Sequence, residues 1–322
     1  MKIHRYVFAV IAGFCFTTAA QAQGYPNKLI KMIIPFPPGG ATDTIGRILA
    51  DGLSKEFGQP VVVETRTGGG GTVGTNALAK SAPDGYTIGV ATVGTHAANP
   101  ACNPKSGSDP ILDFSPISIM ARTPNVLTVG PKSPAQDYKQ IVEFAKKNPG
   151  KLTYATSGTC GIHHLTGEQF RALSGIAITH IPYRGSGPAL TDVLGGQVDL
   201  FFDSLPGSLS MIQSGKLRAI AVAWEKRLAT LPNVPTYAEL GLKPINDAVW
   251  YGLVAPAKTP EAIIKKLNAA VVKVLAMPEV RERIVATGSE PTSDSPAEFG
   301  AEIKSTFEKI NAVVKKEGIA PD

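Results

Sequence analysis

The chain has 322 residues, of which 43% are hydrophobic and 18% are charged. This composition is too apolar and too balanced in charge for a disordered chain, and the length accommodates two domains of roughly 100–200 residues each. The formal net charge is +6, but no cluster of Lys and Arg concentrates it, so the sequence does not predict a nucleic-acid-binding protein.

Residues 1–22 have the features of a cleaved signal peptide. Lys2 and Arg5 form a positive start, residues 7–16 are an uninterrupted apolar or small run, and Ala20 and Ala22 satisfy the small-x-small cleavage rule. A membrane anchor is the alternative, but this run is too short to span about 30 Å of hydrocarbon. We therefore expect an exported mature chain that begins at Gln23 and acts in the periplasm.

The mature chain keeps two cysteines, Cys102 and Cys160. Two thiols in an oxidising compartment favour one disulfide, which requires Cα atoms within about 7 Å of each other. The sequence does not give that distance, so two separate buried thiols remain the alternative.

Strand and helix alternate through the first half of the mature chain. A helical periodicity from Ile45 to Leu53 predicts one helix, and residues 72–80 predict a second. Continuous apolar strands that alternate with helices are typical of a parallel sheet covered on both faces. The apolar runs that predict these strands are residues 30–36, 61–64, 86–91 and 117–120.

The same alternation repeats in the second half, with helical segments between the predicted strands. Two stretches that join the halves also resemble each other, because residues 127–134 and residues 252–260 each lead from an apolar segment into a helix. The strands predicted in this half are residues 152–155, 178–183, 200–203 and 219–224.

Capping signals mark three helix starts. Ser133, followed by proline, is predicted to cap a helix with Gln136 at its third position. Thr259 before a proline repeats the arrangement, and Ser295 opens the last helix in the same way.

Two α/β halves joined by two crossings, with the C-terminal helices returning to the first half, describe a hinged two-lobed receptor. Its cleft would lie between the lobes. We expect residues 23–122 and 248–322 to form domain 1 and residues 123–247 to form domain 2. Ligands of open α/β sheets bind beyond the carboxyl ends of the strands, so the loops that follow the strands are the candidate sites.

The loop after the first predicted strand, residues 36–43, is a candidate anion site. Its two glycines let a ligand approach the backbone, and the N-terminus of the following helix offers unpaired N–H groups. The alternative is a tight turn in which Thr42 or Asp43 caps the helix.

Residues 155–164 form the equivalent loop of the second half. This loop combines three hydroxyls, two glycines and the start of another helix, a donor set that suits a carboxylate. Residues 92–96, 181–185 and 202–204 also follow predicted strands and join the candidates.

A dinucleotide site and a hydrolase are weaker interpretations. Residues 69–74 match G-x-G-x-x-G, but they follow the second strand rather than the first, so a loop that packs a helix against the sheet is favoured. A hydrolase needs a positioned nucleophile and base, and no G-x-S-x-G motif occurs. Ser157, His163 and Asp203 form a triad only on paper, so we expect no enzyme.

A zinc site would require Cys160, His163, His164 and His96 to converge. The adjacent His163 and His164 point in different directions on a helix, and no H-E-x-x-H or paired C-x-x-C motif occurs. We therefore expect no metal, and one of the two adjacent histidines would hydrogen-bond the ligand or pack in the core.

A series of short motifs runs through the mature chain. The motifs are Tyr25-Pro26, PFPPGG at 35–40, GQPVVVE at 58–64, APDGYT at 82–87, DFSPI at 113–117, NPGKL at 148–152, PYRG at 182–185, GGQVD at 195–199, GKLRA at 215–219, LPNVPT at 231–236 and LVAP at 253–256. Their order resembles that of Bug-type solute receptors, the periplasmic substrate-binding proteins of tripartite tricarboxylate transporters. The resemblance covers essentially the whole mature chain, and so many ordered blocks make it specific.

The resemblance implies an α/β, type II Venus-flytrap fold of the periplasmic-binding-protein kind, with two parallel-type sheets, helices on both faces and a double hinge. It implies a monomer without cofactor that delivers a small carboxylate, often a dicarboxylate or an aromatic one, to a large and a small membrane subunit. A receptor for amino acids or other polar solutes remains the alternative. The ligand-binding residues that it implies are Phe36, Pro38, Gly39, Gly40, Thr92, Thr95, His96, Ser157, Gly158, Thr159, Cys160, His163, His164 and Asp203.

The chain departs from the family pattern at residues 101–108, where members usually have a Tyr-containing segment, and at residues 159–161. Each departure contains one of the two cysteines. We therefore expect a disulfide that braces two loops across the mouth of the cleft.

Overall fold

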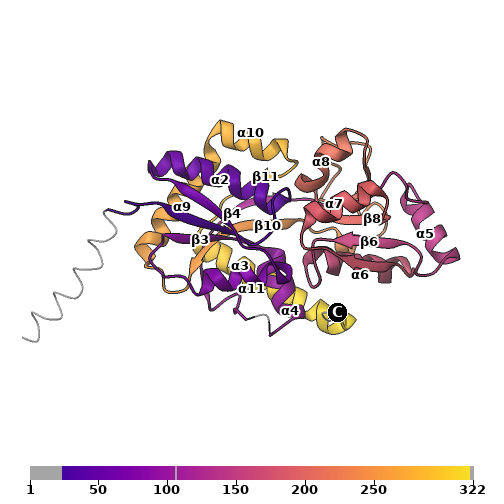
Figure 1. The fold of residues 1–322 in the computed structure, drawn as a ribbon, viewed down its shortest axis with the longest axis horizontal. Coiled ribbons are helices and arrows are strands. Elements are labelled where there is room, and N and C mark those ends of the chain that lie inside the picture. The colour runs from indigo at the N-terminus through magenta and orange to yellow at the C-terminus, as the bar shows by residue number, and fades with distance from the viewer. Residues whose placement is uncertain (1–23, 106, 320–322) are drawn as a thin grey trace, which may run out of the picture.

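The computed structural model describes residues 24–105 and 107–319 as two lobes, each built on one β-sheet (Figure 1). The predicted signal peptide, residues 1–22, and the new N-terminus at Gln23 lie outside the described residues. Within the two described ranges, no helix is both long and apolar enough to cross a membrane.

Lobe 1 is the six-stranded sheet β11-β4-β10-β3-β1-β2 and its helices. The strands are β1 (Ile30–Ile34), β2 (Val61–Thr65), β3 (Thr87–Thr92), β4 (Phe114–Thr123), β10 (Val249–Pro256) and β11 (Glu290–Pro291). The helices are α2 (Ala41–Phe57), α3 (Thr72–Ala79), α4 (Asn99–Cys102), α9 (Glu261–Ala276), α10 (Pro278–Ala286) and α11 (Pro296–Glu317), with short turns η1 (Gly69–Gly71) and η2 (Gly94–Ala98).

Lobe 2 is the five-stranded sheet β7-β6-β8-β5-β9 and its helices. The strands are β5 (Asn125–Val129), β6 (Thr153–Thr156), β7 (Thr179–Pro182), β8 (Leu200–Ser204) and β9 (Arg218–Ala223). The helices are α5 (Tyr138–Lys147), α6 (Ile162–Ser174), α7 (Ser186–Gly195) and α8 (Leu205–Gln213), with the turn η3 (Lys243–Ile245). Helices lie on both faces of each sheet, and the predicted α/β fold class of two lobes is confirmed (Figure 1).

Both sheets are mixed: each contains the expected parallel strands together with antiparallel ones. β1 is parallel to β2 and β3, but β10 is antiparallel to β3 and β4, and β5 is antiparallel to β8 and β9. β5 and β10 are the strands on which the chain enters a lobe after crossing from the other. They start at the cleft side, where the parallel strands end, and must therefore run the opposite way. The two joins predicted over residues 127–134 and 252–260 overlap the ends of these two strands, at residues 127–129 and 252–256.

Two of the three predicted capping signals were wrong. Helix α5 begins at Tyr138, and its cap is Asp137, which accepts from the Gln140 N–H at 2.8 Å. The Ser133 hydroxyl instead donates to the Ala135 carbonyl, and that of Thr259 donates to the Pro256 carbonyl. The capping box of Ser295 at the start of α11 is confirmed.

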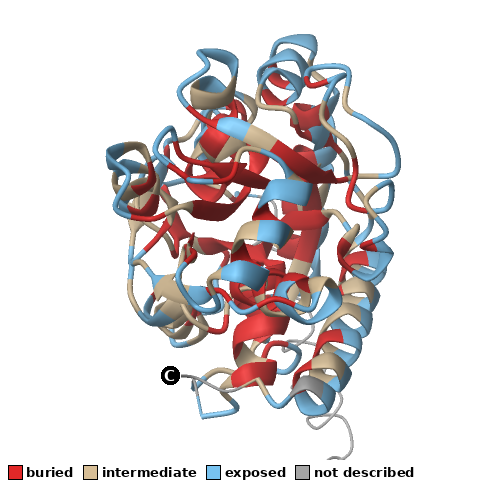
Figure 2. Cartoon of the chain, turned by 90° about the vertical axis from the view of Figure 1, so that its right-hand side faces the viewer, coloured by how far each residue is buried: buried red, intermediate tan, exposed pale blue. Residues whose placement is uncertain are grey.

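Buried strands fill the interior of the molecule, and the outward faces of the helices are exposed (Figure 2). One continuous apolar cluster forms the core of lobe 1, whereas three smaller clusters fill lobe 2. Cys160 and Leu165 come from lobe 2 but pack in the lobe 1 cluster. The lobes therefore share a tightly packed seam beside α6.

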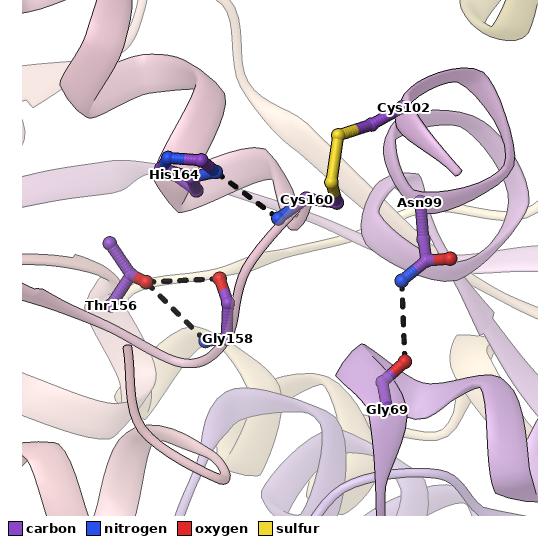
Figure 3. Close-up of a disulfide and its surroundings, with 7 residues drawn as sticks. All are labelled: Gly69, Asn99, Cys102, Thr156, Gly158, Cys160 and His164. Carbon is purple, nitrogen blue, oxygen red and sulfur yellow. Dashed lines mark hydrogen bonds between the residues drawn. A yellow bond between two sulfur atoms is a disulfide. The ribbon is translucent and has the colours of Figure 1, made fainter. Parts of the chain in front are cut away.

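A disulfide crosses this seam. It joins Cys102, the last residue of α4, to Cys160 in the loop before α6, with the Cα atoms 5.6 Å apart (Figure 3). The alternative of two separate thiols is thereby excluded, and the predicted pairing is confirmed. The bridge ties lobe 1 to lobe 2 beside the cleft.

Candidate ligand-binding site

A cavity lies between the lobes, against the first residues of the crossing strand β10. Its walls come from the loops at the carboxyl ends of the parallel strands, as expected for open α/β sheets. Lobe 1 lines the cavity with Phe36, Pro37, Gly40, Ala41, Thr42, Gly70 and residues 92–94. Lobe 2 lines it with Ser157, Gly158, Gly161, Ile162, His163, Ser186, Asp203 and Ser204, and β10 adds residues 249–251.

Four helices begin at this cavity: α2, α6, α7 and α8. Their N-caps are Gly40, Gly161, Gly185 and Ser204, and in the described chain none of these makes a side-chain capping bond. The starts of α2, α6 and α7 therefore offer unpaired N–H groups and a partial positive charge. At the start of α8 the Leu205 N–H donates to the Pro124 carbonyl at 2.9 Å and Pro206 has no N–H, so this helix contributes mainly its dipole. Among the described residues that line the cavity, none is Lys or Arg, so these helix starts are the main source of positive potential for an anion.

The loop before α2 decides between the two interpretations left open for residues 36–43. The N-cap is Gly40, not Thr42 or Asp43, which both lie inside the helix. The Asp43 carboxylate accepts from the Gly39 N–H at 3.3 Å and pairs with Arg47 at 2.7 Å. Because no side chain caps Gly40, the start of α2 stays open toward the cavity, which favours the anion site.

A chain of hydrogen bonds forms the floor of the cavity. The His163 imidazole hydrogen-bonds the Ser157 hydroxyl through Nδ1 and the Ser204 hydroxyl through Nε2, both at 3.1 Å. The Tyr251 hydroxyl donates to Ser204 at 2.9 Å and also contacts the Thr42 hydroxyl of lobe 1. Burial lowers the pKa of His163 to about 4, so its ring is neutral at pH 7, and Ser204 connects it to Tyr251 of the crossing strand.

Asp203 ends the same wall at the carboxyl end of β8. It is only 1% exposed, and its two carboxylate oxygens accept from the Ser186 hydroxyl at 2.7 Å and the Ser208 hydroxyl at 2.8 Å. Burial raises the pKa of Asp203 to about 6, although these two hydroxyl donors oppose that shift.

The hydrolase interpretation fails on geometry. His163 is bonded to Ser157 on one side, but its other nitrogen meets Ser204, while Asp203 is bonded to Ser186 and Ser208. The three residues of the hypothetical triad therefore belong to two separate networks. A nucleophile, base and orienting acid are not connected.

The residues considered for zinc are dispersed. His96 packs against the Phe114 ring at 4.7 Å, and burial lowers its pKa to about 3. His164 accepts from the Cys160 N–H at 3.1 Å (Figure 3) and stacks on His180, with the ring centroids 4.1 Å apart. Over residues 24–105 and 107–319, no group of three or more His, Cys, Asp or Glu side chains is placed to hold a metal.

The glycine run at residues 69–71 lies where the lobes touch. The Asn99 side chain donates to the Gly69 carbonyl at 3.3 Å (Figure 3), and a Cβ on Gly70 would lie 2.7 Å from Asn99 and 3.2 Å from the Thr159 carbonyl of lobe 2. The absence of a side chain at Gly70 lets the two loops meet. This role explains the run better than a dinucleotide site does.

The structure brings half of the predicted ligand-binding residues to the cavity. Those that line it are Phe36, Gly40, Thr92, Ser157, Gly158, His163 and Asp203, and those outside its lining are Pro38, Gly39, Thr95, His96, Thr159, Cys160 and His164. Most of the second group shape the loops: Thr95 bonds Thr92, and His164 holds the loop at Cys160. Which of them contact a ligand stays a prediction.

Sequence reasoning missed several lining residues, above all Tyr251, Trp250, Ser186 and Thr42. Ser186 directly follows the glycine of a loop that was singled out, so its position gave a signal. No sequence signal pointed to Tyr251 and Trp250. They lie just before residues 252–260, which were interpreted as a link into a helix and not as part of a strand that enters the cleft.

The family model described as "Tripartite tricarboxylate transporter family receptor" matches residues 45–319. The chain is 36% identical over 313 residues to protein BugT of Bordetella pertussis strain Tohama I. The aligned region covers 97% of this chain and 95% of that protein.

Two solved structures show the same fold with a named ligand. R. palustris Rpa4515 with adipate superposes with a TM-score of 0.89 at 34% identity and covers 92% of this chain and 100% of that one. MatC (Rpa3494) from Rhodopseudomonas palustris with bound malate gives a TM-score of 0.86 at 31% identity and covers 90% of this chain and 100% of that one.

Proposed function

The chain belongs to the tripartite tricarboxylate transporter family of receptors, and we propose that it captures a small dicarboxylate between its two lobes. It is a receptor and not an enzyme, as its family is. The mature chain would work in the periplasm as a monomer, after removal of residues 1–22, and hand its ligand to a large and a small membrane subunit.

The observation that carries this proposal is the convergence of four uncapped helix starts on a cavity whose described lining has no Lys or Arg. Such a cavity favours anions through backbone N–H groups and hydroxyls rather than through ion pairs. One carboxylate would sit at the start of α2 and the other near Ser157 and the start of α6.

The ligands named for the two structural neighbours support the same chemistry, because adipate and malate are both dicarboxylates. The neighbours differ in what they hold, so the fold does not fix chain length. A receptor for amino acids is the second candidate, and it shares the carboxylate but adds an ammonium group.

Capture would proceed by closure of the lobes. We assign residues 23–122 and 248–322 to one lobe and residues 123–247 to the other, with the ligand completing its contacts only in the closed state. The mouth is tightly shut in this structure: a Cβ on Gly185 would lie 2.3 Å from Pro37 of lobe 1. Opening must therefore separate these two loops.

The disulfide limits how the lobes can open. Cys160 lies between two pairs of lining residues, Ser157 with Gly158 and Gly161 with Ile162, and Cys102 holds it to α4 of lobe 1. Opening would therefore pivot near the bridge and the crossing strands, while the Pro37 and Gly185 loops move apart.

A thermal-shift screen of residues 23–322 against mono-, di- and tricarboxylates and amino acids tests the proposal. A ligand at about 100 times its dissociation constant adds about 2.7 kcal/mol to the free energy of unfolding and should raise the melting temperature by several degrees. We expect dicarboxylates to stabilise the chain most. A shift confined to amino acids would favour the second candidate, and flat curves for ligand-free protein would contradict both.

A further inference from the structure

The wall of the proposed anion site contains a buried acid. Asp203 lines the cavity, is 1% exposed and holds both of its oxygens against serine hydroxyls. A carboxylate ligand would bring a second negative charge into the same enclosed space, where burial makes the repulsion between like charges strong. The site therefore needs a positive charge or a proton when the ligand enters.

The residues nearest to Asp203 supply no positive charge. His163 of α6 and Tyr251 of β10 both reach Ser204, the next residue along β8, but burial keeps the imidazole neutral and raises the pKa of the phenol. From α8, Ser208 contributes a neutral hydroxyl, and β5 pairs with this position through Val126.

The charged groups of the surrounding elements are engaged elsewhere or lie outside the cavity. On α2, Asp43 pairs with Arg47, and on α7, Asp192 accepts from the Tyr183 hydroxyl at 2.7 Å. Arg184, in the loop before α7, is exposed and is not part of the lining. The helix starts at the cavity offset part of the repulsion, and protonation of the buried carboxylate would remove its source.

We propose that ligand capture is coupled to a proton: Asp203 takes up one proton from solvent when a dicarboxylate enters the cleft. This inference rests on the proposed function. In the closed arrangement of the lobes, burial already brings the pKa of Asp203 to about 6, so a nearby anion needs only a moderate further effect to protonate it at pH 7.

The geometry gives the proton a use. While Asp203 is ionised, it can only accept, so the Ser186 hydroxyl at 2.7 Å must donate to it and presents only lone pairs to the cavity. Once Asp203 is protonated, its O–H can donate to the Ser186 oxygen. The Ser186 hydrogen is then free to turn toward a ligand carboxylate. One proton thus removes a repulsive charge and converts Ser186, a lining residue, from an acceptor into a donor.

Calorimetric titration of residues 23–322 with malate and adipate, in buffers of different ionisation enthalpy, measures the protons taken up on binding. We expect uptake of between about 0.5 and 1 proton at pH 7, where both ligands are dianions, and no more than about 0.5 at pH 6, where Asp203 is already half protonated. The affinity should accordingly fall by up to about tenfold per pH unit above pH 7. Binding without proton uptake at pH 7 would overturn the inference and leave the proposed function intact, whereas the absence of binding of every dicarboxylate in the thermal-shift panel would overturn both.

The matched variant is Asp203→Asn, which has a similar shape and no charge. It should bind with no proton uptake and with an affinity that does not change between pH 6 and pH 8. Uptake that persists in this variant would place the proton elsewhere and contradict the inference. Should the variant fail to fold, the wild-type uptake at pH 7 and its decrease at pH 6 still decide the question.

Discussion

The two walls of the cleft differ in chemistry, although both are built from loops at strand ends. The lobe 1 wall presents glycines, threonines, Phe36 and the start of α2, and its described lining has no ionisable side chain. The lobe 2 wall presents three helix starts, serine hydroxyls, His163 and Asp203. The electrostatic potential of the lobe 1 wall therefore does not change with pH. The charge of the lobe 2 wall can change with pH, because Asp203 and His163 can gain or lose a proton.

Cutting the covalent link between the two walls should have the largest effect. Replacing Cys102 and Cys160 together by Ser should lower the free energy of unfolding by about 2–4 kcal/mol, since the bridge closes a loop between residues 58 positions apart. Chemical denaturation measures this, and treatment of the wild type with a reductant is the matched control. If our account of the pivot is right, ligand dissociation also becomes faster. Unchanged stability and unchanged dissociation would contradict it.

Blocking contact between the walls should come next. In Gly185→Ala, the new methyl group would overlap Pro37 in the closed state but not in an open one. A clash of about 1–3 kcal/mol would weaken ligand binding by roughly 5- to 150-fold. Gly175→Ala is the control, because Gly175 also has a positive φ but has no neighbour within 4 Å. Equal affinity in the two variants would mean that closure does not bring these loops together.

Removing a hydrogen-bond donor from the lobe 2 wall should weaken binding less than the upper limit expected for Gly185→Ala. Ser157→Ala loses a hydroxyl that lines the cavity and bonds His163, and we expect at least a tenfold loss of affinity. Calorimetry with the best ligand of the screen measures it. An unchanged affinity would mean that Ser157 does not bind the ligand and that groups of lobe 1 contribute more of the binding free energy.

The smallest effect concerns pH and stability. His96 and His163 have lowered pKa values of about 3 and 4, so between pH 5 and 6.5 the unfolded chain binds up to two more protons at these sites. Asp203, with a pKa raised to about 6, opposes this by up to one proton. The unfolded chain therefore binds about one proton more, and stability should rise by about 1–2 kcal/mol from pH 5 to pH 6.5.

Urea denaturation across this pH range measures that slope. Asp203→Asn removes the opposing group, so its slope should be steeper than that of the wild type. His163→Gln removes one of the two histidines and should flatten it. A wild-type stability that falls with rising pH would show that the burial of His96 and His163 is not what controls this range.

Much of the fold could be predicted because local pattern and tertiary structure agree. The apolar runs that gave β1, β3, β6, β8 and β9 are largely buried strands, and those that gave β2 and β7 are partly exposed edge strands. Ser295 caps α11 as its sequence indicates. The antiparallel direction of the crossing strands β5 and β10 was not predicted, because it depends on the route of the chain between the lobes and not on the residues of the strands. Ser133 and Thr259 were wrongly predicted to be helix caps, because a hydroxyl before proline can hydrogen-bond the backbone of a turn as readily as that of a helix start.

The candidate site was predictable to the extent that it follows strand ends. The loops of Gly40, Ser157 and Asp203 all reach the cavity for this reason. His96 and His164 also follow strand ends in the sequence, but neither reaches the cavity. His96 packs in the core and His164 bonds the loop at Cys160, because the direction of a side chain near a helix start depends on packing. Tyr251 reaches the cavity only because β10 enters from the cleft side.

The central claim is that backbone dipoles and hydroxyls in this cleft bind the carboxylates of one small ligand. Calorimetric titration of residues 23–322 at pH 7 with adipate and with adipamide, its neutral diamide, tests this most directly. We predict one molecule of adipate per chain with an affinity at least about a hundredfold above that of adipamide, because two charge-assisted sites are lost. Equal affinities, or no saturable binding of any dicarboxylate, would contradict the account.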